Sequence, residues 1–237
     1  QIMLPEFDYQ GQQRLLSARV LIIGLGGLGS PVAFYLASAG VGTLVLADDD
    51  VVDESNLQRQ IIHGEADVGI NKVASAKASI AALNSGVLVE TLQQRLSGEM
   101  LAKEVLKADV VVDCCDNLVT RLAVNKACLQ HQTPMISGAA IRMEGQVIVV
   151  DPRELSTPCY HCLMQFTGEQ EHSCSTTGVM APIVGIIGAI QAMEAIKVIS
   201  HFGQPLVGKL LLLDAKTMQW KTFSLPKDTA CPSCSKI

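Results

Sequence analysis

Four of the eight cysteines form two Cys-x-x-Cys pairs, Cys159 with Cys162 and Cys231 with Cys234. Two such pairs supply four thiolates, the ligand set of a tetrahedral structural zinc site. Because four sulfur ligands leave no open position on the metal, we expect zinc here to stabilise the fold and not to take part in a reaction. Sixty-eight residues separate the pairs, so the site would fasten the C-terminal tail to the body of the chain. Redox chemistry is the alternative, but neither pair opens a thioredoxin-like βαβ unit.

A glycine-rich loop near the N-terminus is the second feature with chemical meaning. It follows the apolar run 20–23, precedes a helical pattern and contains Gly24, Gly26, Gly27 and Gly29. A turn of this kind brings backbone N–H groups close to a phosphate, and the helix N-terminus adds partial positive charge. The loop therefore predicts nucleotide binding, although a purely structural tight turn is the alternative and the loop does not specify the nucleotide.

The polar residues that follow favour a nucleoside triphosphate. Asp48 lies nineteen residues beyond Gly29, where an acid hydrogen-bonds ribose hydroxyls in dinucleotide-binding folds, although a solvated acidic turn is the alternative. Asn56, Arg59 and Lys72 come next. The loop and the helix N-terminus are sufficient to bind the two phosphates of a dinucleotide. Additional cationic side chains favour a triphosphate, because they stabilise the negative charge that develops on the leaving pyrophosphate. Either cation alone is also common on protein surfaces.

A later predicted strand ends in Asp113-Cys114-Cys115-Asp116-Asn117. Its carboxyl end should lie near the glycine loop, because ligands of open α/β sheets bind there. Asp116 can then hold Mg²⁺ against phosphate oxygens. The alternative is that Asp116 or Asn117 caps the helix that begins at Leu118, and the spacing leaves both open.

One further cysteine, Cys174, lies in the polar segment 172–177 beside His172. A thiol in an exposed loop near a histidine can become a reactive thiolate, which leaves covalent or persulfide chemistry open for Cys174. Most lone cysteines are not nucleophiles. Cys114, Cys115 and Cys128 fall in apolar segments, so we expect them to be packing residues.

The elements that must position these residues alternate between strand and helix, which predicts an α/β fold with a mostly parallel sheet and helices on both faces. The predicted strands are 19–23, 43–47, 87–91, 109–113 and 135–137, and the predicted helices are 30–39, 71–83, 99–107 and 118–131. After Gly138 the pattern changes. We expect one or two strands over 139–150 with a turn near Glu144-Gly145, a loop over 152–158, a mobile polar loop over 167–177, a long apolar helix over 178–200, and a hairpin of 209–214 with 219–225.

Composition restricts the class of protein. Hydrophobic residues make up 49% and charged residues 17%, a composition compatible with apolar surface buried in an oligomer. The net charge of −5 argues against nonspecific nucleic-acid binding. The N-terminus lacks the basic and apolar regions of a signal peptide. The apolar stretch 178–193 contains Pro182 and Gln191 and is short for a membrane span, so we expect a buried or interface helix. We therefore expect a cytoplasmic protein with reduced thiols and no membrane or nucleic-acid partner.

Together these motifs resemble the MoeB/ThiF/HesA family of adenylyltransferases, bacterial relatives of the ubiquitin-activating enzymes. The resemblance covers essentially the whole chain. It rests on the glycine loop, Ser55-Asn56-Leu57-Gln58-Arg59-Gln60, Gly69-x-x-Lys72, Asp116-Asn117-x-x-x-Arg121 and the two cysteine pairs. The segments 137–146 and 178–182 are most similar to the MoeB branch.

The resemblance implies a Rossmann-like ATP-binding fold and a reaction. In this family, ATP and Mg²⁺ activate the C-terminal glycine carboxylate of a ubiquitin-like sulfur carrier protein that ends in Gly-Gly, pyrophosphate leaves, and a sulfur donor converts the acyl-adenylate to a thiocarboxylate. The MoeB branch serves molybdopterin biosynthesis, and the ThiF branch, which serves thiamin thiazole synthesis, is the alternative. An NAD-dependent oxidoreductase and a non-catalytic carrier-binding scaffold are more distant alternatives.

The resemblance also implies roles for individual residues. Asp48 would hold the ribose, Asp116 would bind Mg²⁺, and the phosphate contacts and their neighbours would be Asn56, Arg59, Gln60, Lys72 and Asn117. The loop with Cys174 resembles the family's crossover loop, which lies over the carrier's tail. An arginine just before Gln1 would reach the ATP of the partner subunit.

The resemblance also implies an oligomeric state and a sulfur donor. It implies a homodimer, which would account for the apolar segment 178–199, and a separate sulfur donor of the cysteine desulfurase or rhodanese type. We expect a single domain over 1–237, with a nucleotide-binding part over about 1–138 and a carrier-binding and zinc part over about 139–237.

Overall fold

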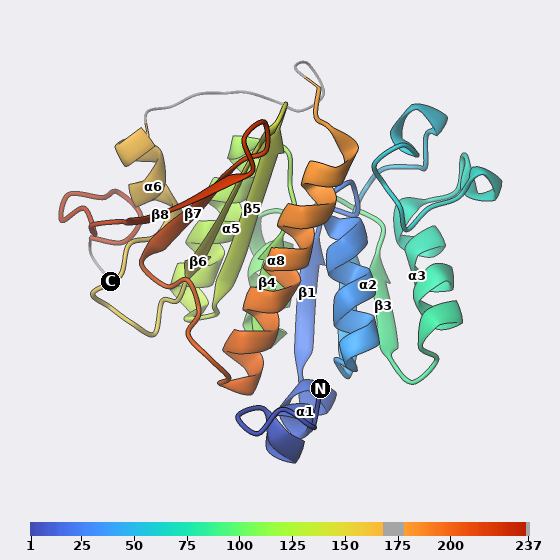
Figure 1. Cartoon of the computed structure of the whole chain (residues 1–237), viewed down its shortest axis with the longest axis horizontal. Helices are drawn as coiled ribbons and strands as arrows, with labels where there is room; N and C mark the ends of the chain where they lie inside the picture. The colour runs from blue at the N-terminus through green and yellow to red at the C-terminus, as the bar shows by residue number, and fades with distance from the viewer. Residues whose placement is uncertain (168–177, 236–237) are drawn as a thin grey trace.

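The strands of the described part of the chain form one sheet in the order β3-β2-β1-β4-β5-β6-β7-β8 (Figure 1). This computed structural model describes residues 1–167 and 178–235. The strands β1 to β5 pair in parallel, and β6, β7 and β8 continue the sheet antiparallel. In chain order the strands are β1 Arg19–Ile23, β2 Thr43–Ala47, β3 Leu88–Leu92, β4 Val110–Asp113, β5 Met135–Ile141, β6 Glu144–Val150, β7 Lys209–Asp214 and β8 Gln219–Ser224. The predicted mostly parallel α/β sheet with antiparallel strands after it is confirmed.

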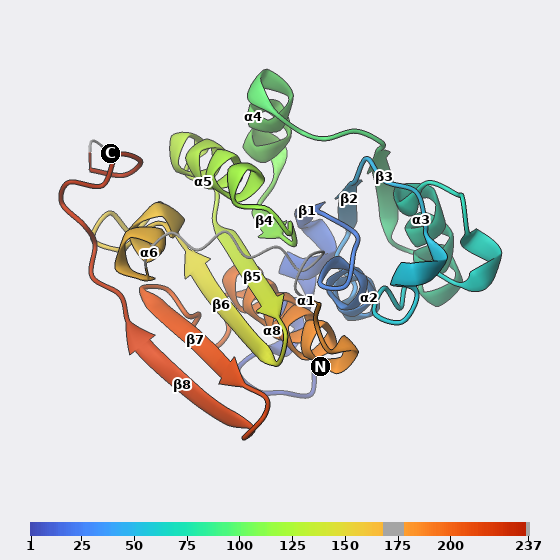
Figure 2. The ribbon, with the colours of Figure 1, turned by 90° about the horizontal axis from the view of Figure 1, so that it is seen from above.

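Helices cover both faces of the sheet, with α2 and α8 on one side and α4 and α5 on the other (Figure 2). The described helices are α1 Asp8–Ser17, α2 Gly29–Ala39, α3 Lys72–Leu83, α4 Gly98–Lys107, α5 Leu118–His131, α6 Tyr160–Thr167 and α8 Ala181–Ser200, with short 3₁₀ helices η1 Glu54–Asn56 and η2 Glu65–Asp67. Successive side chains of β1 enter opposite cores: Val20 and Ile22 pack on the α2 and α8 side, and Leu21 and Ile23 on the α4 and α5 side. Because both faces of β1 are covered by helices, both sets of its side chains are apolar, which is typical of a central strand in a parallel sheet.

Helix α8 is the predicted long apolar helix, and it begins at Ala181, three residues later than expected. Its length and composition would allow it to cross a membrane, but such a helix is equally typical of a protein core. In its most apolar 18-residue stretch, 61% is buried within the fold. The Gln191 amide donates to the Asp113 carbonyl at 2.8 Å, which ties the helix to the end of β4. The packing supports the prediction of a buried helix.

Strand β5 differs from the prediction. We expected a short strand over 135–137 and a change at Gly138, but β5 continues to Ile141, and the turn falls at Arg142 and Met143. Gly138 does not interrupt the strand. A side chain there would overlap the buried Gln191 side chain, so the glycine makes room for α8.

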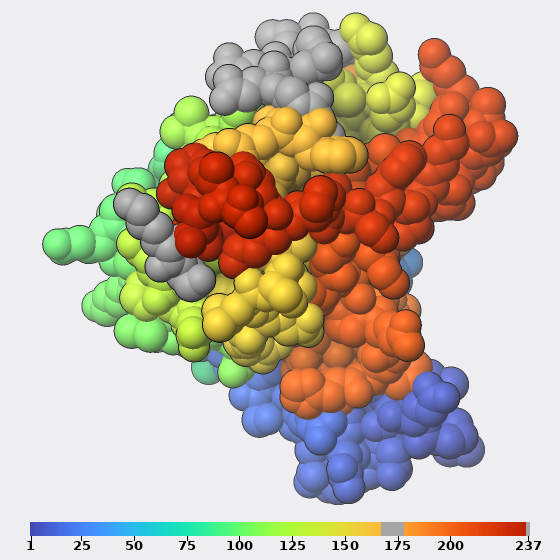
Figure 3. All heavy atoms as spheres, turned by 90° about the vertical axis from the view of Figure 1, so that its left-hand side faces the viewer, coloured from blue at the N-terminus to red at the C-terminus, as the bar shows by residue number. Residues whose placement is uncertain are grey.

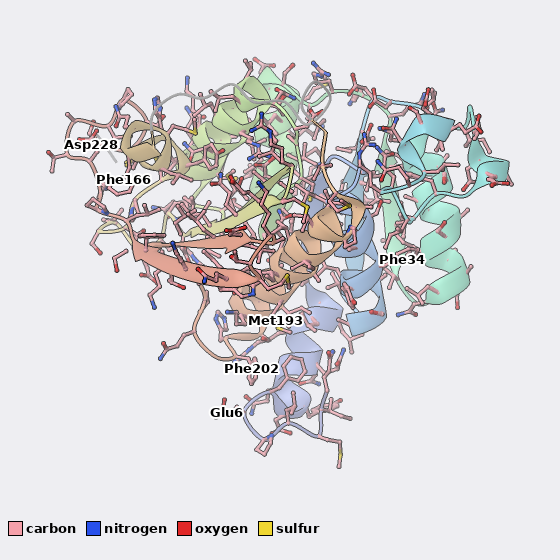
Figure 4. All side chains as sticks on the ribbon, turned by 45° about the horizontal axis from the view of Figure 1, so that its top comes forward. Glu6, Phe34, Phe166, Met193, Phe202 and Asp228 are labelled. Carbon is pink, nitrogen blue, oxygen red and sulfur yellow. The ribbon has the colours of Figure 1, made fainter. Side chains whose placement is uncertain are left out.

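The sequence patterns did not predict α1 and α6. Helix α1 is polar on average, and it is held by contacts with α8. Phe202, which follows α8, packs edge-to-face against Phe7, with ring centroids 6.0 Å apart. Figure 4 shows Phe202 beside the N-terminal helix. Helix α6 begins at Tyr160, inside the first cysteine pair, and this segment was interpreted only as a source of metal ligands.

Candidate functional site

A cavity of about 950 Å³ opens at the carboxyl ends of the parallel strands. This volume is typical of a small-molecule site. The predicted site residues that line it are Gly24, Gly26, Gly27, Asp48, Arg59, Gln60, Lys72, Asp116 and Asn117. Gly29 and Asn56 do not line it. The structure thus brings together residues that are up to ninety-three positions apart in the chain.

The glycine loop fits closely against the end of β4. Gly24 has a φ of +93°, and a Cβ there would lie 2.8 Å from the Cys114 carbonyl oxygen, so only glycine is accommodated. Gly29, the first residue of α2, packs against the Gly24 carbonyl with no room for a side chain. The loop backbone can therefore stay close to the strands and line the cavity itself.

Asp48 connects the glycine loop to the end of β2. Its Oδ2 accepts the Leu25 N–H at 2.7 Å, and its Oδ1 accepts the Asp50 N–H at 2.9 Å. Burial raises the pKa of Asp48, while the nearby Lys72 opposes that shift. Each carboxylate oxygen has a second lone pair, so Asp48 can brace the loop and still accept a hydroxyl hydrogen bond from a ligand.

The predicted phosphate-binding cations occupy one side of the cavity. Lys72 is the first residue of α3, is 5% exposed, and its Nζ pairs with Asp50 Oδ2 at 2.8 Å. Arg59 donates from its guanidinium to Asn56 Oδ1. Asn56, which does not reach the cavity, therefore orients Arg59. Gln60 is 5% exposed, and its Oε1 has no hydrogen-bond partner in the described part of the chain.

Asp116 and Asn117 differ in their surroundings. Asn117 caps α5, because its Oδ1 accepts the Thr120 N–H at 2.9 Å. Asp116 is exposed and lines the cavity. Its carboxylate contacts only the Asn117 amide, at 3.4 Å, among the hydrogen bonds of the described residues. A carboxylate that faces a cavity is a hard oxygen ligand, which fits the chemistry of Mg²⁺.

A buried polar network supports the Asp116 segment, and the sequence analysis did not identify it. Ser137 Oγ donates to Asp113 Oδ2 at 2.6 Å. Arg121, which is 7% exposed, donates through Nε to the Cys115 carbonyl at 3.2 Å and through Nη1 to the Tyr160 hydroxyl at 3.2 Å. Arg121 belongs to the motif Asp116-Asn117-x-x-x-Arg121, but no role was predicted for it. Its burial follows from the packing of α5 against α6, which a single sequence does not show.

The four paired cysteines meet at one buried cluster, although they come from distant parts of the chain. The Sγ–Sγ distances are 3.9 Å for Cys159–Cys162, 3.7 Å for Cys159–Cys231 and 3.5 Å for Cys162–Cys234. A tetrahedral zinc with Zn–S bonds of about 2.3 Å requires sulfurs about 3.8 Å apart, so the donor set fits this metal. Because a disulfide bond is only about 2.05 Å long, none of these three sulfur–sulfur contacts is a disulfide.

The C-terminal tail, which carries Cys231 and Cys234, lies against residues 150–167 (Figure 3). His161 Nδ1 and Ser233 Oγ, 2.8 Å apart, add a direct contact between the two cysteine segments. Burial raises the pKa of Cys159 to about 11. A bound dication would reverse this shift by stabilising the thiolate.

The other cysteines divide into two groups. Cys114, Cys115 and Cys128 are buried, and burial raises the pKa of each thiol, which supports the prediction that they are packing residues. Cys174 lies outside the described residues, so its reactivity remains a prediction from the sequence.

Comparisons with known proteins identify the family of the chain. Residues 1–233 match the ThiF family. The chain is 46% identical over 236 residues to the molybdopterin-synthase adenylyltransferase of Salmonella typhimurium, covering 100% of this chain and 94% of that protein. It is 47% identical over 234 residues to the sulfur carrier protein ThiS adenylyltransferase of Escherichia coli, covering 99% of this chain and 92% of that protein.

Solved structures show the same fold. The structure of Escherichia coli MccB with ATP superposes with a TM-score of 0.80 at 25% identity, covering 95% of this chain and 69% of that one. The structure of PaaA gives a TM-score of 0.78 at 26% identity, covering 93% of this chain and 68% of that one. With the family match over nearly its whole length, this chain belongs to the ThiF family of adenylyltransferases.

Proposed function

We propose that this protein uses ATP to adenylate the C-terminal glycine carboxylate of a ubiquitin-like sulfur carrier protein. The observation that carries the proposal is the shared cavity. It places a glycine loop, two cations and an exposed carboxylate at one edge of the sheet. Relatives that share more than 40% of their residues with this chain are named for this activity.

The arrangement suits attack by a carboxylate on a phosphate. An oxygen of the carrier carboxylate forms a bond to the α-phosphorus of ATP, the bond from that phosphorus to the bridging oxygen breaks, and pyrophosphate leaves with the electron pair. The glycine loop would seat the phosphates, and Asp48 would accept a ribose hydroxyl. Arg59 and Lys72 would stabilise the charge that develops on the phosphates, which is the main contribution a protein makes to such transfers.

Two metals fit the residues of the chain. Asp116 would hold Mg²⁺ beside the phosphates, where the ion neutralises phosphate charge. Lys72 pairs with Asp50. We expect it to exchange this partner for a phosphate oxygen when ATP binds. The four-cysteine cluster would hold Zn²⁺ in a structural role, and the geometry of its sulfurs supports this assignment.

We favour the molybdopterin pathway for the carrier, with the thiamin carrier as the alternative. The segments 137–146 and 178–182 support this choice, whereas identities of 46% and 47% to the two kinds of relative do not distinguish them. We further propose a cytoplasmic homodimer, a separate sulfur donor, and a single domain in which residues from about 139 onward bind the carrier.

Carrier-dependent exchange of pyrophosphate into ATP tests the reaction class. We expect exchange only when a carrier ending in Gly-Gly is present, and no exchange with the same carrier lacking its last glycine. ATP binding without exchange for any carrier would instead support a non-catalytic scaffold. Reduction of NAD by the protein would support the oxidoreductase alternative.

Replacing Cys174 with alanine should leave adenylation unchanged and preserve most thiocarboxylate formation. The physical reason is that the phosphoryl step needs positioned charge and no protein nucleophile. Adenylation and sulfur transfer should be measured separately in the variant. Normal adenylation with abolished thiocarboxylate formation would place Cys174 on the sulfur path and overturn this expectation.

A further inference from the structure

The backbone of Leu25, in the middle of the glycine loop, is held on both sides by side chains from outside the loop. Its N–H donates to Asp48 Oδ2 at 2.7 Å, and its carbonyl lies 3.0 Å from His63 Nε2. The Leu25 side chain is itself fully buried. The position of the loop therefore depends on two side chains. Asp48 was predicted as a ribose ligand, and His63 was not predicted.

His63 is buried, being 6% exposed, and both of its ring nitrogens have partners. A carbonyl oxygen can only accept, so Nε2 must carry the hydrogen. The second nitrogen, Nδ1, lies 2.8 Å from Ser75 Oγ, and the Ser75 hydroxyl also interacts with the Asp67 carboxylate. Burial, with Lys72 adding to the effect, lowers the pKa of His63, against the hydrogen bond to the Leu25 carbonyl and the carboxylates of Asp67 and Asp48, which raise it.

Helix α3 connects this histidine to the phosphate-binding cations. Lys72 faces the cavity, Ser75 contacts His63, and Ser79 Oγ donates to the Ile62 carbonyl at 2.7 Å. These positions are three and seven residues apart, the spacing of one face of an α-helix. The same helix face therefore fixes both Lys72 and the segment that supports the glycine loop.

We propose that His63 is a positioning residue that holds the glycine loop in the shape that binds the phosphates of ATP. It does so by donating from Nε2 to the Leu25 carbonyl, while Ser75 holds the other ring nitrogen. The inference rests on the proposed function, because it assigns ATP to the loop. Loss of the donor leaves a buried carbonyl unpaired, and the loop must move toward water or another donor to satisfy it.

Three variants test this role. In His63→Leu the donor is lost, in His63→Gln the terminal amide can replace Nε2–H, and in Ser79→Ala a hydrogen bond to the same segment is lost without contact to the loop. The measurements are the Kd for ATP without carrier, the KM and kcat of carrier-dependent pyrophosphate exchange, and the melting temperature.

We expect His63→Leu to raise the Kd and KM for ATP by about tenfold with a much smaller change in kcat. His63→Gln should restore most of the affinity. Ser79→Ala, which leaves the Nε2 donor in place, should lower the melting temperature and raise the KM much less than His63→Leu does. If His63→Leu does not fold, Ser75→Ala should still raise the KM, because it removes the contact that holds the other nitrogen of the ring.

Wild-type affinity in a folded His63→Leu protein would overturn the inference, as would an equal rise of the KM in Ser79→Ala or no restoration by His63→Gln. Failure of the wild-type protein to bind ATP would refute the proposed function instead, so the two failures can be told apart.

Discussion

Replacing Arg59 with alanine should lower the rate of adenylate formation by about a hundredfold or more, the effect typical of losing one preorganised charge contact to a transition state. Arg59 lines the cavity, and its guanidinium is oriented by Asn56. Because Arg59 is not part of either core, the melting temperature should change little. Single-turnover formation of the carrier adenylate measures the rate directly.

Two further variants make this result specific. Arg153→Ala removes a guanidinium that pairs with Asp151 and does not line the cavity, so adenylation should stay at the wild-type rate. Asn56→Ala keeps the Arg59 guanidinium but removes its partner, and we expect a smaller loss than in Arg59→Ala. Adenylation at the wild-type rate in Arg59→Ala would remove Arg59 from the mechanism.

Replacing Cys162 with alanine should abolish stoichiometric zinc binding and release the C-terminal tail. Freshly purified wild-type protein should contain one zinc per chain, because four buried sulfurs lie at the separations that a tetrahedral ion requires. Binding of a structural zinc contributes directly to folding free energy. If the variant loses about 3 kcal/mol, its melting temperature should fall by roughly 10 °C for a chain of this size.

Elemental analysis and thermal unfolding check this prediction together. Cys128→Ala serves as the control, since Cys128 is a buried cysteine outside the cluster, and this variant should keep its zinc. Wild-type protein that contains no zinc, with four titratable thiols at the paired cysteines, would contradict the assignment.

Several elements of the fold were predictable from the sequence. The helix Leu118–His131 and the strands Arg19–Ile23 and Thr43–Ala47 were predicted with their observed bounds. The two strands are short apolar runs, and the helix begins directly after the capping residue Asn117. Helix α1 was not predictable, because its contacts with α8 and the Phe7–Phe202 pair replace the local signals that it lacks.

The residues of the candidate site were more predictable than the network that supports them. Glycines, acids and cations at the ends of strands carry a chemical signal in the sequence, and most of them line the cavity. His63 and Tyr160 carry no such signal. They act through hydrogen bonds to Leu25 and Arg121, which exist only once α3 and α6 have packed against the sheet.

The most direct test of the proposed activity is the intact mass of the carrier itself. The protein should be mixed with ATP, Mg²⁺ and each of several carriers that end in Gly-Gly, and each carrier's mass recorded before and after. We predict the added mass of one adenylyl group on at least one carrier, only in the presence of ATP, and its absence when the terminal glycine is removed. Folded, ATP-binding protein that adenylates none of the carriers would contradict the proposed function.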